Sequence, residues 1–266
     1  MPVASVIMGV YNCKNIELLE KSIHSIICQT YTDWEFLICD DGSTNGTKEQ
    51  LQRLGKLDPR IQILGYEKNR GLSGALNECL KYAKGKYIAR EDDDDYSELD
   101  RLKKQVDFLE NHHEFDLVGS NATVINDTGV WGQYTTPEYP QKTDFLWNSP
   151  FLHPSIMITK KAIDALEGYR SYKHIGRCED YDLFMRFYAK GYRGYNIQEN
   201  LYNYWIQNDP NVNYRPMNIR INEAVVRYKG FKAMGILGKG IPFILKPVVL
   251  GLIPSRLFSK LRKTQY

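Results

Sequence analysis

The chain has 266 residues, of which 42% are hydrophobic and 25% charged. These proportions are typical of globular proteins, and they exclude a wholly disordered, collagen-like or disulfide-scaffold chain. Thirty-five Lys and Arg against 32 Asp and Glu give a net charge of +3, which does not indicate nucleic acid as a partner. Nine of the basic residues and none of the acidic ones follow position 226, so an acidic body carries a basic C-terminal tail.

The five cysteines are scattered along the chain and form no CxxC pair. A zinc-ribbon or thioredoxin-like site is therefore not predicted, and this usage favours a reducing compartment. The N-terminus has no basic leader followed by a long apolar stretch, so we predict no secretory signal. The expected location is the cytoplasm.

Short apolar runs alternate with helical patterns through the first 115 residues. Strands are predicted at residues 3–8, 35–39, 60–64 and 86–89, and helices at 16–27, 48–56 and 72–83. Ser97, with Asp100 three residues later, resembles a capping box and predicts the start of a further helix. Strand–helix alternation with short links predicts right-handed βαβ units, and so an α/β fold around a mostly parallel, Rossmann-like sheet.

The pattern is less regular after residue 115. Strands are predicted at 116–120, 123–125 and 155–158, with an irregular antiparallel segment at 129–136. Helices are predicted at 160–166 and from Glu179 to Gly191. This part of the chain is expected to add a smaller antiparallel portion to the sheet. Tyrosines around 195–205 could stack on the rings of a ligand, although aromatic side chains more often belong to a core.

The C-terminal tail is apolar at residues 236–253, but Pro242, Pro247, two lysines and several glycines interrupt it. It is therefore too broken to predict a membrane span. Apolar patches among basic residues suit contact with an anionic lipid surface, at the inner face of the cell membrane. The alternative is a basic amphipathic helix that packs on the rest of the protein or on a second subunit.

Polar side chains follow three of the predicted strands. They are Tyr11-Asn12, Asp40-Asp41 and the run from Asp92 to Asp95. In parallel sheets, ligands bind in the crevice at the carboxyl ends of the strands. We therefore expect these three groups, which are distant in sequence, to line one site.

The acidic run Glu91–Asp95 is the most unusual feature of the sequence. Adjacent carboxylates repel one another, and a divalent cation with oxygen ligands would offset that repulsion. A solvated acidic turn is an equally good interpretation of the run alone. An EF-hand loop is excluded, because counting from Asp92 the sixth position is Ser97 rather than Gly and the twelfth is Lys103 rather than Glu.

Two further groups could contact a nucleotide. The carboxylate of Asp41 could accept hydrogen bonds from a base or a ribose, although a plain turn is the simpler interpretation. Asn69 and Arg70 lie between a predicted strand and a helix start, where an amide and a cation could meet a diphosphate. A helix entry with a free surface arginine explains these two residues equally well.

Several motifs, in the same order, resemble those of the family 2 glycosyltransferases of the GT-A fold. The matching segments are residues 5–12, 25–31, 34–43, 69–77, 87–90, 153–155 and 179–183, which read SVIMGVYN, SIICQTY, WEFLICDDGS, NRGLSGALN, YIAR, HPS and EDYDL. The resemblance spans roughly residues 3–205. It implies a GT-A domain over residues 1–225, with a nucleotide-binding half at 1–115 and an acceptor-binding half at 116–225. Residues 226–266 are then a helical, basic amphipathic tail.

The resemblance also implies roles for individual residues. Asp180 corresponds to the catalytic base, and Asp94 to the direct ligand of Mn²⁺ or Mg²⁺ in a DXD-type motif. The expected contacts to the nucleotide sugar are Val10, Tyr11, Asn12, Asp41, Asn69, Arg70, Asp92 and Asp93. Four consecutive Asp residues leave the register of the acidic motif open by one position. His153 corresponds to a recurrent position for which a structural hydrogen bond is at least as good an interpretation as catalysis.

The activity that the resemblance implies is inverting, metal-dependent sugar transfer. The donor would be a nucleoside diphosphate sugar, most commonly a UDP-sugar, and the acceptor a hydroxyl of a glycan or a lipid-linked oligosaccharide in cell-surface polysaccharide synthesis. A sugar nucleotidyltransferase is the nearest alternative enzyme, but residues 9–13 lack the Gly-rich basic loop expected after its first strand. A non-catalytic glycan-binding module is a second alternative.

Overall fold

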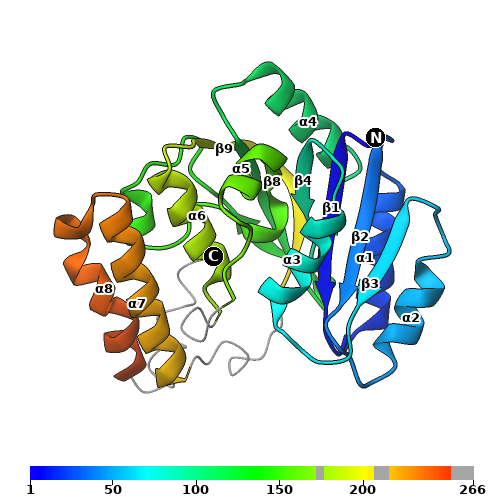
Figure 1. Ribbon diagram of the computed structural model, residues 1–266, viewed down its shortest axis with the longest axis horizontal. Helices are drawn as coiled ribbons and strands as arrows, with labels where there is room; N and C mark the ends of the chain where they lie inside the picture. Colours follow the sequence, from blue (N-terminus) through cyan, green and yellow to red (C-terminus); the bar gives the residue numbers. More distant parts are fainter. Residues whose placement is uncertain (172–176, 207–215, 253–266) are drawn as a thin grey trace.

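The computed structural model describes residues 1–171, 177–206 and 216–252, and it shows an α/β fold built around one sheet (Figure 1). In these ranges the sheet has nine strands. Eight follow the order β3-β2-β1-β4-β8-β6-β9-β5, and β7 pairs with β6. The predicted fold class is therefore confirmed.

The first half of the sheet is parallel. Its strands are β1 (Ala4–Val10), β2 (Trp34–Asp40), β3 (Ile61–Gly65) and β4 (Tyr87–Arg90). The intervening helices are α1 (Ile16–Ile27), α2 (Thr47–Leu54) and α3 (Leu72–Tyr82). Asn15 caps α1 by accepting the backbone N–H groups of Glu17 and Leu18. These elements lie close to their predicted positions.

The second half mixes parallel and antiparallel pairs. Its strands are β5 (Tyr96–Ser97), β6 (Leu117–Asn126), β7 (Gly129–Tyr134), β8 (Met157–Thr159) and β9 (Gly194–Trp205). The helices are α4 (Arg101–Asn111), α5 (Lys160–Ala165) and α6 (Glu179–Ala189), with short 3₁₀ turns at Asp144–Leu146 and His153–Ser155. The two strands predicted between 116 and 125 are one continuous strand, because β9 pairs with β6 along its length.

The capping box predicted at Ser97 is wrong. Ser97 belongs to β5, where it pairs with Tyr202 of β9, and its hydroxyl donates to the carboxylate of Glu91 at 2.5 Å. The helix α4 begins later, at Arg101, and the side chain of Asp100 makes no capping hydrogen bond. Strand pairing and a buried acid therefore compete successfully with the local capping signal.

The core lies on both faces of the sheet, as the alternation of side chains along β1 requires. Ile7 belongs to the cluster beneath α3, α5 and α6, whereas Val6 and Met8 belong to the cluster beneath α1, α2 and α4. Figure 1 shows α3 and α5 in front of the sheet and α1 behind it. Tyr202 is fully buried, and the ring centroid of Tyr195 lies 4.5 Å from that of Phe108 in a stacked pair. These two tyrosines therefore pack within the protein and are not available to stack on a sugar.

The first part of the C-terminal tail is packed on the domain. The helices α7 (Met217–Ala233) and α8 (Leu237–Leu252) lie side by side next to α6, at the left of Figure 1. The boundary expected at residue 226 therefore falls inside α7, because Val226 and Phe231 are buried in the main core. Arg227 holds α7 further by donating to the carbonyls of Leu146 and Trp147.

The described residues include no helix that is long and apolar enough to cross a membrane. Up to the last described residue, α8 covers 16 residues, fewer than the ~20 that a bilayer needs. It continues through Pro242 and Pro247, so the prolines that argued against a span do not prevent a helix. The basic positions Arg256, Lys260, Arg262 and Lys263 lie outside the described residues.

A fully buried ion pair fixes the end of β4. The side chains of Glu91 and Arg101 are both 0% exposed, and they meet at 2.8 Å. Arg101 also donates to Ser97 and to the carbonyl oxygens of Arg90 and Ile156. Burial raises the pKa of Glu91 to about 7, and the positive charge of Arg101 opposes that shift. One guanidinium thus joins α4 to β4, β5 and the segment before β8.

We predict that Glu91→Ala destabilises the fold by about 3–5 kcal/mol, because it leaves the buried charge of Arg101 without a partner. The matched control is Glu110→Ala, which breaks the exposed Lys86–Glu110 pair at 2.8 Å and is expected to cost less than about 1 kcal/mol. The measurement is the midpoint of urea unfolding. Equal shifts for the two variants would contradict the structural role of the Glu91–Arg101 pair.

Candidate active site

The strands β1, β2 and β4 end side by side. In the sheet register, Val10 lies opposite Asp40 and Ile7 lies opposite Arg90. The segments that follow these strands therefore emerge at one edge of the sheet, as predicted. The charges of Asp93 and Asp94 both raise the pKa of Cys13, which places the acidic run within electrostatic range of the segment after β1.

Asp41 is the centre of the first polar group. It is buried, and its carboxylate accepts three hydrogen bonds: from the Tyr66 hydroxyl at 2.6 Å, the Asn69 amide at 2.8 Å and the Arg70 backbone N–H at 2.7 Å. The guanidinium of Arg70 lies 4.1 Å above the ring of Tyr66. The structure thus brings Asp41, Asn69 and Arg70 together. It adds Tyr66, which the sequence analysis missed.

The segment after β1 packs against the same group. The Val10 carbonyl accepts the Asp41 N–H at 2.8 Å, whereas the Val10 side chain is buried in the core. Asn12 has a φ of 47° and binds the 43–44 turn, donating its N–H to Ser43 and accepting from Thr44. Tyr11 is 49% exposed and so offers a ring to a ligand. Val10 therefore contributes to this group through its backbone and not through its side chain.

The acidic run divides into two inward and three outward carboxylates. Glu91 and Asp95 are buried, and Asp95 accepts the backbone N–H of Trp205 at 2.7 Å. Asp92 and Asp93 are partly buried and Asp94 is exposed, in a turn. The arrangement favours the register Asp92–Asp94 for a ligand-binding motif, because Asp95 already serves β9.

Arg90 is the cation that lies behind this turn. Its side chain is 1% exposed and donates to the carboxylate of Asp92 and to the carbonyl of Glu91. Tyr202 adds a hydrogen bond from the Asp92 N–H to its hydroxyl at 3.2 Å, and the Ser22 hydroxyl donates to the Asp92 carbonyl at 2.7 Å. Residues from β4, β9 and α1 therefore hold Asp92 in place.

The negative charges of the outer carboxylates are destabilised by desolvation and by one another. Burial, with the charges of Asp94 and Asp92, raises the pKa of Asp93 to about 7. The side chain of Asp94 reaches the surface, but the protein around it removes enough water that desolvation, with the charge of Asp92, raises the pKa of Asp94 to about 6. A divalent cation would offset the repulsion between these carboxylates, and carboxylate oxygens are ligands that Mg²⁺ and Mn²⁺ accept.

Few side chains at the turn could nevertheless act as metal ligands. In the described ranges no group of three or more His, Cys, Asp or Glu side chains is arranged to hold a metal ion unaided. Mg²⁺ is commonly bound by one or two carboxylates together with substrate phosphates and water. The outward pair Asp92 and Asp94 fits that mode, in which a diphosphate completes the coordination.

The second half of the site is the start of α6. Glu179 and Asp180 occupy its first turn, and the Tyr181 N–H donates to the Asp180 carboxylate at 2.7 Å. Acids at a helix N-terminus are stabilised by the macrodipole. Burial and the charge of Asp180 nevertheless raise the pKa of Glu179 to about 7. Arg90 and Asp92 also act on that pKa, so the start of α6 lies within electrostatic range of the acidic turn.

Tyr169 lies within electrostatic range of both halves of the site, and His153 contacts it. The charges of Arg90, Asp92, Glu179 and Asp180 all act on the pKa of Tyr169, which is raised chiefly by burial. Its hydroxyl is 2.8 Å from Nε2 of His153. Burial and the charge of Arg90 lower the pKa of His153 well below its usual range, so its ring is neutral at pH 7. This supports the structural interpretation of His153.

Arg90, Arg101 and Tyr66 are the site residues that sequence reasoning missed. Arg90 belongs to the matched segment YIAR, but no role was predicted for it. The sequence does not show whether an arginine next to a run of acids points into the protein or toward solvent. Arg101 lies on the buried side of a helix, where its spacing alone resembles that of a core residue. Tyr66 follows a predicted strand, as the other polar groups do, and that position was the available signal.

Known proteins resemble this chain over much of its length. The protein family model described as "Glycosyl transferase family 2" matches residues 5–167. The provisionally named glycosyltransferase EpsE of Bacillus subtilis is 37% identical over 263 residues, which cover 98% of this chain and 94% of EpsE.

A second relative is the Escherichia coli enzyme WfaP, a UDP-Glc:α-D-GlcNAc-diphosphoundecaprenol β-1,3-glucosyltransferase. It is 29% identical over 196 residues, which cover 74% of each chain. Among solved structures, S. aureus TarS residues 1–349 in complex with UDP-GlcNAc superimposes with a TM-score of 0.72, at 19% identity, over 92% of this chain and 73% of that one. The TarS likeness shows the GT-A fold. With the family match and the EpsE similarity, it leads to one conclusion: this chain belongs to glycosyl transferase family 2.

Proposed function

We propose that the protein transfers a sugar, with inversion, from a UDP-sugar to a hydroxyl of a glycan or lipid-linked acceptor during cell-surface polysaccharide synthesis. The observation that carries this proposal is the juxtaposition of the Asp92–Asp94 turn with the start of α6, through Arg90. The UDP-GlcNAc complex of TarS supports the choice of donor. The lipid diphosphate acceptor in the name of WfaP supports the choice of acceptor.

The residues at the sheet edge have distinct roles in this proposal. Asp41, with Tyr11, Asn12, Asn69 and Arg70, binds the nucleoside and diphosphate of the donor. Asp92 and Asp94 hold Mn²⁺ or Mg²⁺, which when bound neutralises negative charge on the leaving diphosphate. Arg90 keeps Asp92 in position for this purpose.

The base acts from the other side of the donor. Asp180 takes the proton of the acceptor hydroxyl as the hydroxyl oxygen bonds to the anomeric carbon. The bond from that carbon to the diphosphate oxygen breaks in the same step, and the electron pair leaves with UDP. Glu179 is the second candidate for the base, because a pKa of about 7 suits proton transfer at neutral pH.

The tail supports a second part of the proposal, contact with a membrane surface. The exposed side chains of α8 at Ile241, Leu245, Val249 and Leu252 are 56–72% exposed and share one helix face. Lys239 and Lys246, seven residues apart, lie together to one side of that face, and the Lys246 ammonium lies 3.6 Å above the ring of Trp147, itself 58% exposed. An apolar stripe with neighbouring cations and a tryptophan suits an anionic bilayer interface.

We predict that Asp180→Asn lowers kcat by about 10²–10⁴-fold, since the variant cannot accept the proton, while UDP-sugar binding is retained. The matched control is Glu179→Gln, which neutralises the neighbouring acid and is expected to reduce kcat far less. Turnover is followed as UDP release over a panel of sugar donors, and donor binding by calorimetry. The reverse ranking would assign the base to Glu179, and near-normal turnover in both variants would remove α6 from catalysis.

Chelation by EDTA is expected to abolish UDP release, and Mn²⁺ or Mg²⁺ to restore it. Asp94→Asn should raise the metal concentration needed for half-maximal activity by about tenfold or more, as loss of one carboxylate ligand implies. Asp164→Asn, at an exposed acid on α5 paired with Lys160, is the control and should have no effect. Metal-stimulated UDP binding gives a readout that is independent of turnover. Full activity in EDTA would contradict the metal role.

We predict that the protein floats with phosphatidylglycerol liposomes and not with neutral phosphatidylcholine liposomes. Combined Ile241→Ser, Leu245→Ser and Val249→Ser should lower the partition coefficient about 100-fold, at roughly 1 kcal/mol for each side chain. The control combines Leu57→Ser, Leu99→Ser and Val130→Ser, three exposed apolar positions elsewhere. Equal recovery of the wild type with both lipids, or equal loss in both triple variants, would refute the contact.

A further inference from the structure

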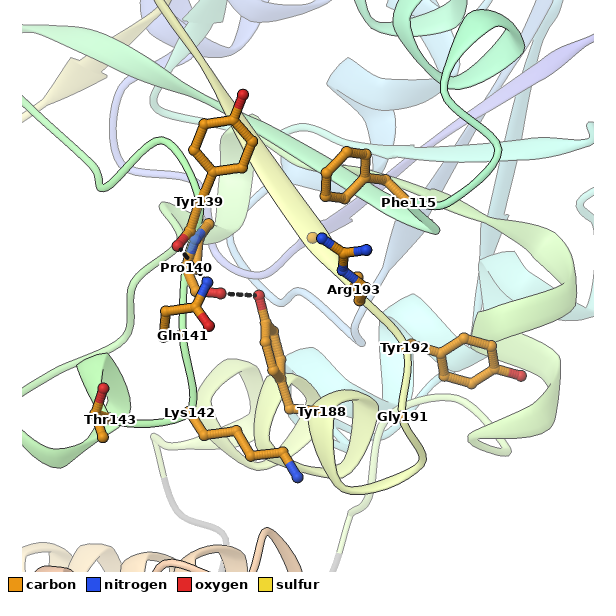
Figure 2. A pocket seen from close by; sticks show the side chains of 11 residues that line it. Phe115, Tyr139, Pro140, Gln141, Lys142, Thr143, Tyr188, Gly191, Tyr192 and Arg193 are labelled. Atoms are coloured by element: carbon orange, nitrogen blue, oxygen red, sulfur yellow. Dashed lines mark hydrogen bonds between the residues drawn. The ribbon is translucent and has the colours of Figure 1, made fainter.

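A cavity lies away from the acidic turn. It has a volume of about 490 Å³ and is formed by the loop at residues 139–143, the end of α6 with residues 191–194, and Phe115 before β6 (Figure 2). Asp180 is at the other end of α6, and the 11 residues of that helix span ~16 Å. The volume falls in the range of roughly 300–1,000 Å³ that is usual for small-molecule sites.

The walls of this cavity combine aromatic rings with two cations. The rings of Phe115, Tyr139 and Tyr188 line it, and Figure 2 shows Arg193 beside Phe115 and Lys142 below Tyr188. Tyr188 is fixed by a hydrogen bond from its hydroxyl to the Pro140 carbonyl at 2.9 Å. Tyr139 is 55% exposed and packs edge-on against Tyr195. Flat apolar ring faces on a rigid wall suit the C–H faces of a sugar ring.

The charges of Lys142 and Arg193 are not paired with acidic side chains in the described ranges. No carboxylate lines the cavity, and within the described ranges neither Lys142 nor Arg193 forms a salt bridge. Lys142 donates to the Met234 carbonyl at 3.2 Å, which leaves ammonium protons for a ligand. Arg193 lies 5.1 Å above Phe115. The adjoining acids are engaged, Glu138 by the Tyr195 hydroxyl and Asp144 by the Gln141 N–H.

We propose that this cavity binds an anionic saccharide, a sugar unit that carries a carboxylate or a phosphate. The guanidinium of Arg193 and the ammonium of Lys142 bind the anion, and Tyr139 packs against the ring. The site is separate from the donor edge and takes no part in the transfer of the sugar. It holds a charged glycan at the opposite end of α6 from the base.

The test is calorimetric binding at low salt with three probes: α-1,4-linked trigalacturonate, the neutral trisaccharide maltotriose, and inorganic phosphate. Trigalacturonate should bind at least about tenfold more tightly than either of the others, as expected for charge-assisted hydrogen bonds added to ring contacts. Its affinity should fall with added salt. Equal affinity for maltotriose overturns the role of the anion, equal affinity for phosphate overturns the role of the sugar, and no binding overturns the proposal.

Variants place the bound probe. Arg193→Gln and Tyr139→Ala, both at exposed side chains, should each weaken trigalacturonate binding by about tenfold or more. Lys161→Gln and Tyr82→Ala, at an exposed lysine on α5 and an exposed tyrosine on α3, are the matched controls and should bind as the wild type does. Losses that are equal in all four variants place the probe elsewhere and refute the assignment. Binding needs no donor and no turnover, so this result is independent of the proposed transferase reaction.

Discussion

Five consecutive carboxylates can follow a core strand only because two buried guanidinium groups lie against them. Arg101 neutralises Glu91 inside the protein, and Arg90 neutralises Asp92 at the edge of the sheet. A buried charge without a partner costs several kcal/mol, so neither arginine could point elsewhere. The middle acids receive no such partner from the protein in the contacts described. The run is thereby divided: Glu91 and Asp95 are buried structural acids, and Asp92 to Asp94 form the outward turn that we propose binds the metal.

The same two arginines connect the halves of the molecule. Arg101 reaches from α4 to the segment before β8, and Arg90 acts on Asp92 at one side and on Tyr169 and Glu179 at the other. In the reaction that we propose, a donor site and an acceptor-side acid on separate elements must be held at a fixed spacing for an in-line displacement. Buried hydrogen-bonded cations provide this fixation with little freedom of movement.

The parts of the fold that sequence could predict are those in which local pattern and tertiary packing agree. β1, β2 and α3 have apolar spacing that matches their burial, and the polar positions after the strands converge as the rule for parallel sheets requires. Ser97 was misassigned because its neighbours in space, Glu91 and Arg101, override its local sequence. The strand β9 was missed because it alternates irregularly: it pairs with β6 through register shifts, and Tyr202 serves both packing and the acidic turn.

Candidate residues were predictable by type more readily than by orientation. Asp41, Asn69 and Arg70 do come together, but the backbone N–H of Arg70, rather than its guanidinium, binds Asp41. Val10 contributes a carbonyl and no side chain. Such distinctions depend on which way a side chain turns, and the packing of the whole sheet decides that.

The strand β9 has a mechanical consequence. It starts at Gly194, which lines the aromatic cavity, and ends at Trp205, whose N–H binds Asp95 beneath the acidic turn. Its 12 residues span at most ~40 Å, and it is bonded to β6 along most of its length and to β5 near its end. A ladder of this kind behaves as a rod rather than a tether. It keeps the distance between the aromatic cavity and the acidic turn almost constant. A polymer bound at both places would therefore have to span that fixed distance.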